Sequence, residues 1–265
     1  MAISLSIICL MMGAVLGSFI CCQVRRTFRR RKEKWSYCES CKKKLGWRDK
    51  IPIISWLLLG GKCRYCNKAI GKMELASEIV GALLLLLTFW SWPHSLGGPE
   101  SLVSGDIKTY ILFGVFLLFL VLFCELALVD IKYKKMPGAK LWLLVLFGGL
   151  FLITRLVCCE INIMNELLAV LGASLILGGV YYVMNKASKG RWVGDGDALI
   201  ALASALVLAH PEMAVWDLFL ANLMGVVLVL VFRRFMRKVK YIPMVPFLFI
   251  GFCVVFVFFF DFYHM

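Results

Sequence analysis

The stretch from Thr109 to Asp130 reads TYILFGVFLLFLVLFCELALVD, a run of about 20 largely apolar residues that ends on an aspartate. Its apolar residues are nearly continuous and follow neither the 3.6-residue period of a half-buried helix nor the two-residue period of a strand. About 20 apolar residues are needed for a helix to cross the roughly 30 Å hydrocarbon core of a bilayer. The stretch therefore predicts a transmembrane helix with a carboxylate at one end.

Similar apolar runs lie on both sides of this stretch, and 62% of the 265 residues are hydrophobic. A soluble domain of this length does not need so much apolar surface. We expect an all-α polytopic membrane protein with about eight transmembrane helices. The first is expected to be retained rather than cleaved as a signal peptide, because it lacks a basic start and a small-residue cleavage site. Spans are predicted at residues 2–22, 74–92, 109–129, 140–157, 166–185, 198–209, 216–232 and 242–260.

Two of these spans have unusual features. The sixth, residues 198–209, has about 12 apolar residues and would make only about 18 Å of helix. We expect it to start partway into the membrane, after irregular backbone that lines a cavity. The last span, residues 242–260, is rich in Phe and is interpreted as an ordinary lipid-facing helix.

The net charge of +14 is concentrated in four segments between the predicted spans. Residues 23–73, 131–140, 186–191 and 233–240 hold 28 of the 30 Lys and Arg residues. Cytoplasmic loops of membrane proteins carry such an excess, so the four segments are predicted to lie in the cytoplasm and both termini outside. This rule already explains the positive charge, and we therefore expect no nucleic-acid partner.

The longest polar stretch, residues 23–73, contains two C-x2-C motifs, formed by Cys38 with Cys41 and by Cys63 with Cys66. Two such turns can direct four thiolates at one metal ion, and a four-thiolate site is closed and structural. The basic segment is predicted to face the reducing cytoplasm, where a disulfide is disfavoured. We expect a structural zinc ion; redox-active thiols or a vestigial site are the alternatives.

The insert also sets the predicted domain organisation. The first transmembrane helix is assigned to residues 1–22, a cytoplasmic four-cysteine insert to 23–73, and a transmembrane bundle to 74–265. An insert of about 50 residues has little core of its own and would depend on the metal to fold.

Two aspartates stand at the ends of predicted spans. Asp130 closes the third span and Asp197 opens the sixth, and the charge pattern places both ends on the cytoplasmic side. Ionisable residues at membrane depth cost roughly 2.5–3.5 kcal/mol on insertion scales, which makes them functional candidates. At equal depth, the two carboxylates can form a pair.

The glycines before Asp197, in Gly194-Asp195-Gly196-Asp197, allow close approach of a peptide substrate to the carboxylate. The local sequence equally allows a plain helix cap, with Asp197 capping and Asp195 in solvent. A calcium loop is a further alternative, but too few oxygen ligands follow.

Other carboxylates are assigned less specific roles. Glu125, one turn before Asp130, is expected to pair inside the bundle or to face a cavity, and Glu78 to support the insert or to lie at the membrane surface. The remaining candidates are assigned to outer loops exposed to solvent: Asp106, Glu160, Glu166, Glu212 and Asp217.

Taken in order, these motifs resemble those of the type IV prepilin peptidases, membrane aspartyl proteases that mature pilins and pseudopilins. The resemblance covers nearly the whole chain, and its parts are specific only as an ordered set. They are Gly17-Ser18-Phe19 at the end of the first helix, the two C-x2-C motifs, Asp49-Lys50-Ile51-Pro52-Ile53-Ile54-Ser55-Trp56-Leu57-Leu58 between them, Glu78, Asp130 with Met136-Pro137, and Gly194-Asp195-Gly196-Asp197.

The resemblance implies that Asp130 and Asp197 catalyse cleavage of a prepilin leader on the cytoplasmic side, with Gly194 and Gly196 in the active-site loop. It also implies methylation of the new N-terminus from S-adenosylmethionine, an activity linked to the N-terminal part. The chain departs from the family pattern at Gly138 and Leu199, which leaves both aspartates in place, and at Cys21-Cys22, which weakens the case for methyl transfer.

Two rival interpretations remain at this stage. One is another intramembrane protease with a G-x-G-D motif, of the presenilin or archaeal preflagellin type, against which the cysteine insert argues. The other is a non-enzymatic, zinc-dependent membrane sensor or transporter, for which the cysteines and not the aspartates would be essential. The basic segment from Arg25 to Lys34 is expected to meet acidic lipid headgroups.

Overall fold

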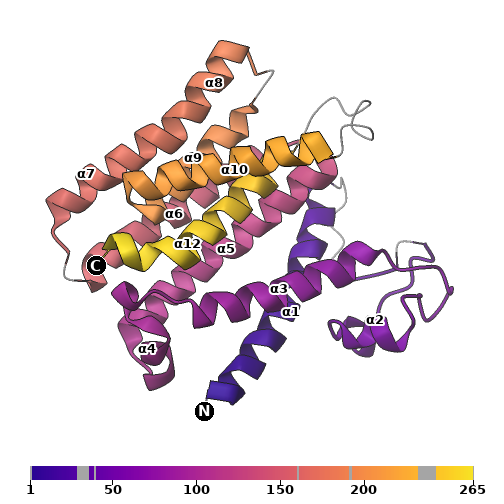
Figure 1. Cartoon of the computed structure of the whole chain (residues 1–265). Helices are drawn as coiled ribbons and strands as arrows, with labels where there is room; N and C mark the ends of the chain where they lie inside the picture. The colour runs from indigo at the N-terminus through magenta and orange to yellow at the C-terminus, as the bar shows by residue number, and fades with distance from the viewer. Residues whose placement is uncertain are drawn as a thin grey trace. The chain divides into compact units, whose positions relative to one another are not determined.

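The computed structural model describes residues 2–28, 36–38, 40–159, 161–190, 193–231 and 243–264. The predicted cytoplasmic segment 233–240, Glu160 and most of the basic stretch from Arg25 to Lys34 lie outside these ranges. The described part is all-helical and contains no β-strand, only two isolated β-bridges. The chain divides into two compact units, Met1–Ser91 and Trp92–Met265 (Figure 1).

Seven helical segments of the described residues are long and apolar enough to cross a membrane. They correspond to seven of the eight predicted spans, and the all-α fold class is confirmed. The eighth, α9, has 14 residues and is the short sixth span. The seven are Ile3–Thr27, Lys72–Trp90, Ile107–Tyr133, Gly138–Cys158, Ile163–Ser188, Pro211–Val231 and Val245–Tyr263.

The first unit consists of α1 (Ala2–Thr27) and α3 (Lys72–Trp90), with the insert between them. The two long helices cross closely (Figure 1), because glycines remove side chains from the contact. A Cβ atom at Gly17 would overlap the carbonyl of Ser77, as expected for small residues at a membrane helix interface. The family motif suggested that Gly17 lies at the end of the first helix. It lies inside the helix instead, because α1 continues to Thr27.

The insert contains one 3-10 turn, η1 (Arg48–Lys50), and one short helix, α2 (Ile54–Leu58). Between residues 36 and 73 only Gly61 and Cys63 are buried among the described residues. The described part of the insert therefore has almost no hydrophobic core. The domain boundaries predicted at residues 22 and 73 stay a prediction.

The second unit begins with η2 (His94–Leu96) and α4 (Gly98–Ser104), and continues through the remaining transmembrane helices. The helices that follow are α5 (Ile107–Tyr133), α6 (Gly138–Cys158), α7 (Ile163–Ser174), the π-helical turn η3 (Leu175–Gly179), α8 (Val180–Ser188), α9 (Asp195–Leu208), α10 (Pro211–Val231) and α12 (Val245–His264).

Helix α12 lies between α5 and α10 (Figure 1) and contributes much of the core. Phe252, Phe256 and Phe260 are almost fully buried, and the Phe252 and Phe256 rings stack on Phe116 of α5. The prediction of an ordinary lipid-facing helix was therefore wrong. Aromatic side chains are equally at home in lipid and against other helices, so the Phe-rich composition does not distinguish the two environments.

Helix α9 is enclosed by protein over most of its length. It packs on α6, α7 and η3, and its residues from Ala203 to Leu208 have almost no exposure apart from Leu206. A helix that contacts protein on all sides does not need to match the bilayer thickness. This explains why 14 residues are sufficient at this position.

Two acidic residues predicted to be solvent-exposed are buried. Asp217 is fully buried in α10, which begins at Pro211, several residues before the predicted span. Glu166, in the first turn of α7, forms an ion pair with the buried Arg155 at the end of α6. The other two described residues of this group, Asp106 and Glu212, are exposed as expected, and Asp106 caps α5 by accepting from the backbone of Thr109.

Candidate active site and cysteine cluster

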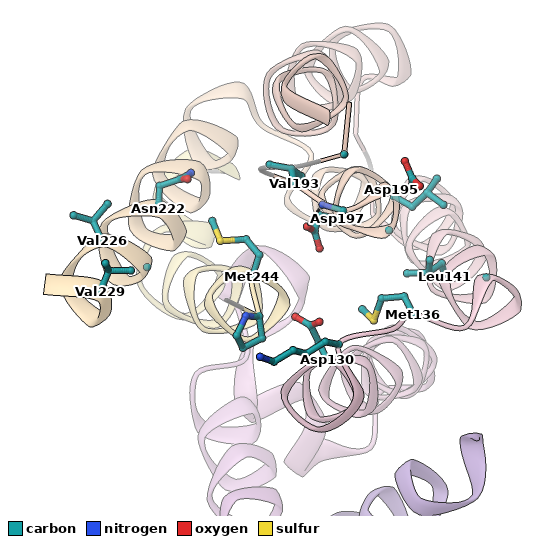
Figure 2. A pocket seen from close by; sticks show the side chains of 18 of the residues that line it. Asp130, Met136, Leu141, Val193, Asp195, Asp197, Asn222, Val226, Val229 and Met244 are labelled. Atoms are coloured by element: carbon teal, nitrogen blue, oxygen red, sulfur yellow. Dashed lines mark hydrogen bonds between the residues drawn. The ribbon is translucent and has the colours of Figure 1, made fainter. Parts of the chain in front are cut away.

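A cavity of about 900 Å³ lies in the second unit, where several helix ends meet (Figure 2). Its walls come from the end of α5, the start of α6, the start of α9, the later turns of α10 and the residues just before α12. The lining residues are Asp130, Lys134, Met136, Gly138, Leu141, Gly190, Val193, Gly194, Asp195, Gly196, Asp197, Leu199, Asn222, Gly225, Val226, Val229, Leu230, Pro243 and Met244.

Asp130 reaches this cavity from the last turn of α5, where the predicted span ended. Its Oδ2 atom accepts a hydrogen bond of 3.2 Å from the backbone N–H of Val245, the first residue of α12. The side chain is anchored by a residue 115 positions away, and only 9% of Asp130 is exposed.

Asp197 reaches the cavity from the first turn of α9. Its backbone N–H donates to the Gly194 carbonyl at 3.2 Å, and its Oδ2 atom accepts from the Gly194 N–H at 2.9 Å. This is the reciprocal bonding of a helix cap, so the carboxylate does take part in capping, as the simpler interpretation held. The bond uses one oxygen, which leaves Oδ1 available to the cavity.

The structure brings together the two aspartates that the sequence predicted as a pair. Both carboxylates point into the same space from opposite walls, whereas the Asp195 side chain is directed away from it (Figure 2). Asp197 is as buried as Asp130, with 9% exposed. Asp130 lies at a helix C-terminus and Asp197 at a helix N-terminus, so the helix dipoles act on the two carboxylates with opposite sign.

The two glycines of the loop have different surroundings. A Cβ atom at Gly196 would lie 3.1 Å from Leu141 Cδ1 and 3.3 Å from Met136 Cβ. The start of α9 therefore packs against the segment that follows Asp130, and a side chain at position 196 would press on that segment. Gly194 instead lies beside the Asp197 carboxylate, and a Cβ atom added at Gly194 would lie 3.4 Å from Asp197 Oδ2.

The backbone before α9 is held in place by Asn185 of α8, whose amide donates to the Val193 carbonyl at 2.8 Å. Val193 and Gly194 are non-helical and line the cavity, as predicted for the start of the short span. Glu125, also on α5, pairs with Lys140 of α6, so the expectation that it pairs inside the bundle is confirmed.

The cavity residues that were not predicted from the sequence include the polar or sulfur-bearing side chains of Lys134, Asn222 and Met244. Asn222 was detectable, because it is the only amide within the apolar span 216–232. The other two were not, because a lysine after a span and a methionine before one are ordinary residues at a membrane surface.

The four cysteines of the insert come together in the first unit. Their sulfur atoms all lie within 4.8 Å of one another, and Cys38 and Cys66 have Sγ atoms 3.8 Å apart. A tetrahedral zinc site with Zn–S distances of about 2.3 Å has sulfur atoms about 3.8 Å apart. The four thiols therefore fit a closed metal site.

The two C-x2-C turns share one backbone geometry. The backbone N–H of Cys38 donates to the Lys43 carbonyl, and that of Cys63 to the Lys68 carbonyl, each at 2.9 Å. Lys42 and Asn67, at matching positions in the two turns, both have positive φ, 59° and 55°. The backbone N–H of Cys41 holds the pKa of the Cys38 thiol down to about 6, which favours the thiolate that a metal binds.

Glu78 of α3 is buried and accepts a 2.7 Å hydrogen bond from the backbone N–H of Ile53 in the insert. Ile53 has φ of 61°, an uncommon conformation for a β-branched residue. Asp49 joins the two halves of the insert by accepting from the Gly46 backbone and from Arg64. Of the two roles left open for Glu78, the contact with Ile53 supports the role in holding the insert.

The fold and the two sites define a multi-pass helical membrane protein with paired buried carboxylates and a four-thiol cluster. Residues 11–92 match the model of the bacterial peptidase A24 N-terminal domain. The resemblance to the type IV prepilin peptidases is confirmed by curated relatives whose names describe leader peptidases of prepilins or prepilin-like proteins.

Among the relatives is the type 4 prepilin-like proteins leader peptide-processing enzyme of Escherichia coli O78:H11, 42% identical over 60 residues, which are 23% of this chain and 22% of that protein. The prepilin leader peptidase/N-methyltransferase of Vibrio cholerae is 23% identical over 83% of this chain and 80% of its own length. The protein of the same name from Klebsiella pneumoniae is 29% identical over 66% of this chain and 74% of its own.

The match thus spans about a fifth of the first of these relatives and roughly three quarters or more of the other two. No solved structure matches the chain.

Proposed function

We propose that this chain is a membrane aspartyl endopeptidase that removes the leader of type IV prepilins or pseudopilins at the cytoplasmic face of the cell membrane. The observation that carries the proposal is the convergence of Asp130 and Asp197, both nine-tenths buried, on one cavity. The names of the relatives supply the substrate class, because each is a leader peptidase of prepilins or prepilin-like proteins.

The chemistry follows from two carboxyl groups that share one proton. Two like charges at close range in a poorly solvated site do not both ionise, so the pair holds one carboxylate and one carboxylic acid. The carboxylate removes a proton from water as the water oxygen bonds to the scissile carbonyl carbon. The carboxylic acid then protonates the departing amide nitrogen as the C–N bond breaks.

The helix ends suggest which aspartate has which role. A helix N-terminus favours negative charge and a C-terminus disfavours it. We therefore assign the base to Asp197 and the acid to Asp130. Infrared carboxylate bands, recorded with each aspartate in turn changed to Asn, test this assignment. Finding that Asp130 is the residue ionised at low pH would reverse it.

Cleavage of a prepilin by purified protein in detergent is the central experiment. We expect Asp130→Asn and Asp197→Asn each to lower cleavage by about 10³-fold or more, a typical loss when one member of a catalytic unit is removed. Asp195→Asn is the matched control, because its side chain is directed away from the space between the aspartates. Normal cleavage by both catalytic variants would refute the proposal.

The same experiment distinguishes the proposed protease from the rival function, a zinc-dependent membrane sensor or transporter. That function would survive both aspartate changes and be lost when Cys38, Cys41, Cys63 or Cys66 is replaced. The proposed protease has the opposite ranking, with the aspartates essential and the four cysteines holding a structural zinc ion. When bound, the metal would supply a cross-link for the insert and take no part in the cleavage chemistry.

A second activity, methylation of the new N-terminus from S-adenosylmethionine, is part of the proposal because two relatives are named N-methyltransferases. We assign this step to the first unit, because the family resemblance links methyl transfer to the N-terminal part of the chain, and residues 11–92 match the A24 N-terminal domain. Transfer of labelled methyl groups to cleaved pilin is the measurement, and cleaved but unmethylated product would restrict the protein to proteolysis.

A further inference from the structure

One face of α10 forms a wall of the cavity, and it is apolar except at one position. Gly225, Val226, Val229 and Leu230 follow Asn222 at the spacing of a single helix face. Val226 and Leu230 are more than half exposed, at 56% and 64%, so the cavity continues onto a surface of lipid-compatible side chains. A carboxamide on such a face needs an explanation, because polar side chains are costly in a membrane helix.

The orientation of the Asn222 side chain is determined by its partners. Its Nδ2 atom donates to the Leu218 carbonyl at 2.7 Å and to the Tyr181 hydroxyl at 3.2 Å. A carbonyl oxygen only accepts, so the nitrogen must occupy this position and the amide cannot be flipped. Both donors are then used, and Oδ1 remains as an acceptor without a partner among the described residues.

Tyr181 makes this arrangement rigid. It lies on α8 and is fully buried, so its hydroxyl is a stationary anchor for the amide of Asn222. Asn222 itself is half-buried and extends from α10 towards the cavity that holds Asp130 and Asp197 (Figure 2). The result is one hydrogen-bond acceptor in a fixed place on an otherwise apolar wall.

A peptide that enters this cavity brings backbone N–H groups that must find acceptors. In a site shielded from water, each unsatisfied N–H costs free energy comparable to a lost hydrogen bond. The apolar residues of α10 offer no acceptor, and the aspartates are occupied with the scissile bond. Asn222 Oδ1 provides the acceptor that a substrate backbone running along α10 requires.

We propose that Asn222 is a substrate-binding residue that accepts a hydrogen bond from a peptide N–H of the prepilin segment near the scissile bond, with Tyr181 as its positioning residue. The inference rests on the proposed protease function. It assigns the side chains of Val226, Val229 and Leu230 on α10 to contact with the apolar residues of the substrate.

The rival explanation is that Asn222 only joins α10 to α8, because polar side chains often link membrane helices. A purely structural link would alter the melting temperature and not the recognition of particular substrate atoms. The kinetic constants KM and kcat therefore need to be measured alongside thermal unfolding for each variant.

The experiment uses the full-length protein and a synthetic peptide with the leader and the first apolar residues of a prepilin. Asn222→Leu removes the carboxamide at similar size, and Tyr181→Phe removes one anchor. Leu223→Ala is the control, since Leu223 is 43% exposed on α10 and does not line the cavity. We expect Asn222→Leu to raise KM about tenfold, as for one lost hydrogen bond, with a smaller increase for Tyr181→Phe and none for the control.

A set of peptides in which single backbone N–H groups, away from the scissile bond, are replaced by ester oxygen identifies the partner. At the peptide position whose N–H binds Asn222, the ester should lower kcat/KM of the wild type about tenfold. The same ester should not lower the kcat/KM of Asn222→Leu, because that variant has already lost the hydrogen bond. The inference would be overturned if the effects of the ester and of Asn222→Leu on kcat/KM multiplied independently at every peptide position. Wild-type kinetics for Asn222→Leu would also overturn it. Failure of the wild type to cleave the parent peptide would instead refute the protease function on which the inference rests.

Discussion

The carboxylate of Asp130 accepts the backbone N–H of Val245, and this 3.2 Å bond joins the last turn of α5 to the first turn of α12. The first N–H groups of a helix have no partner within the helix itself. Asp130 supplies one for α12, and the α12 terminus in turn fixes the position of a proposed catalytic group. The structural and proposed catalytic roles of this residue are separable by choice of substitution.

Replacement of Asp130 by Ala should destabilise the protein, whereas Asn should largely preserve stability. Ala leaves the buried Val245 N–H without an acceptor, which costs about 1–3 kcal/mol of the free energy of unfolding. The Asn side chain keeps a carbonyl oxygen at the same place. Chemical unfolding in detergent measures the difference, and equal stability of the two variants would show that the hydrogen bond contributes little.

Gly196 should tolerate Ala and reject Val. An added Cβ lies 3.1–3.3 Å from side-chain atoms of Leu141 and Met136, which can shift by a few tenths of an ångström. Ala also favours the helix over Gly by about 0.5–1 kcal/mol, which offsets this crowding. Val adds two further carbons and should cost about 1–3 kcal/mol by overpacking, and displace the Met136 segment next to Asp130. Unfolding and cleavage rates measure the two effects.

Gly149 provides the matched control for this comparison. It also lies in a helix, α6, and a Cβ there would meet nothing within 4 Å. Ala and Val at position 149 should both leave stability and cleavage close to those of the wild type. If Val were harmful at both glycines, helix propensity and not the contact with Met136 would be the cause.

The insert should unfold when its metal is removed. Among the described residues between 36 and 73 only Gly61 and Cys63 are buried, so this part of the insert lacks an apolar core and a structural zinc ion would supply most of its stability. Cys38→Ser or a strong chelator should reduce bound zinc from about one ion per chain and expose the insert to limited proteolysis. Zinc content by mass spectrometry and the rate of cleavage within the insert are the measurements.

Cys158→Ser is the control for the metal experiment, because Cys158 lies at the end of α6, far along the chain from the cluster and outside it. Zinc content should be unchanged in this variant. Full zinc occupancy in Cys38→Ser, or an intact insert without metal, would contradict the structural role.

Glu78 should be required for the conformation of the insert. Its carboxylate accepts the Ile53 N–H, and Ile53 has a positive φ that costs about 1–3 kcal/mol for a non-glycine residue. Glu78→Leu removes the acceptor and should speed limited proteolysis near Ile53. Glu78→Gln keeps a carbonyl oxygen and should have a much smaller effect. Equal sensitivity of the two variants would mean that burial of the side chain, and not the hydrogen bond, is what matters.

Local patterns in the sequence predicted much of this molecule correctly. Apolar length identified the spans, and the short run at 198–209 identified the short helix α9 and the non-helical backbone before it. The two C-x2-C motifs predicted the clustered cysteines, because each turn is determined by a few neighbouring residues. For Gly194-Asp195-Gly196-Asp197, two interpretations competed, and Asp197 both caps α9 and faces the cavity.

Burial within the bundle was the main failure of the sequence analysis. Several residues that had been assigned to solvent or lipid are buried against protein: Asp217, Glu166, and Phe252, Phe256 and Phe260 of α12. An apolar side chain is equally favourable in lipid and in a helix interface, so hydropathy does not identify its neighbours. An acidic residue near a predicted span end appears exposed until the actual helix start is known.

The sequence by itself determined that the chain is a helical membrane protein, where its helices lie and which two aspartates stand at helix ends. These properties depend on length, composition and short motifs, which act over one or two turns of backbone. Only the tertiary structure decided that Asp130 and Asp197 face one cavity, that Val245 anchors Asp130, and that Asn222 lies on the α10 wall of the same cavity. Such contacts join residues tens of positions apart, and they follow from how side chains of different helices pack together.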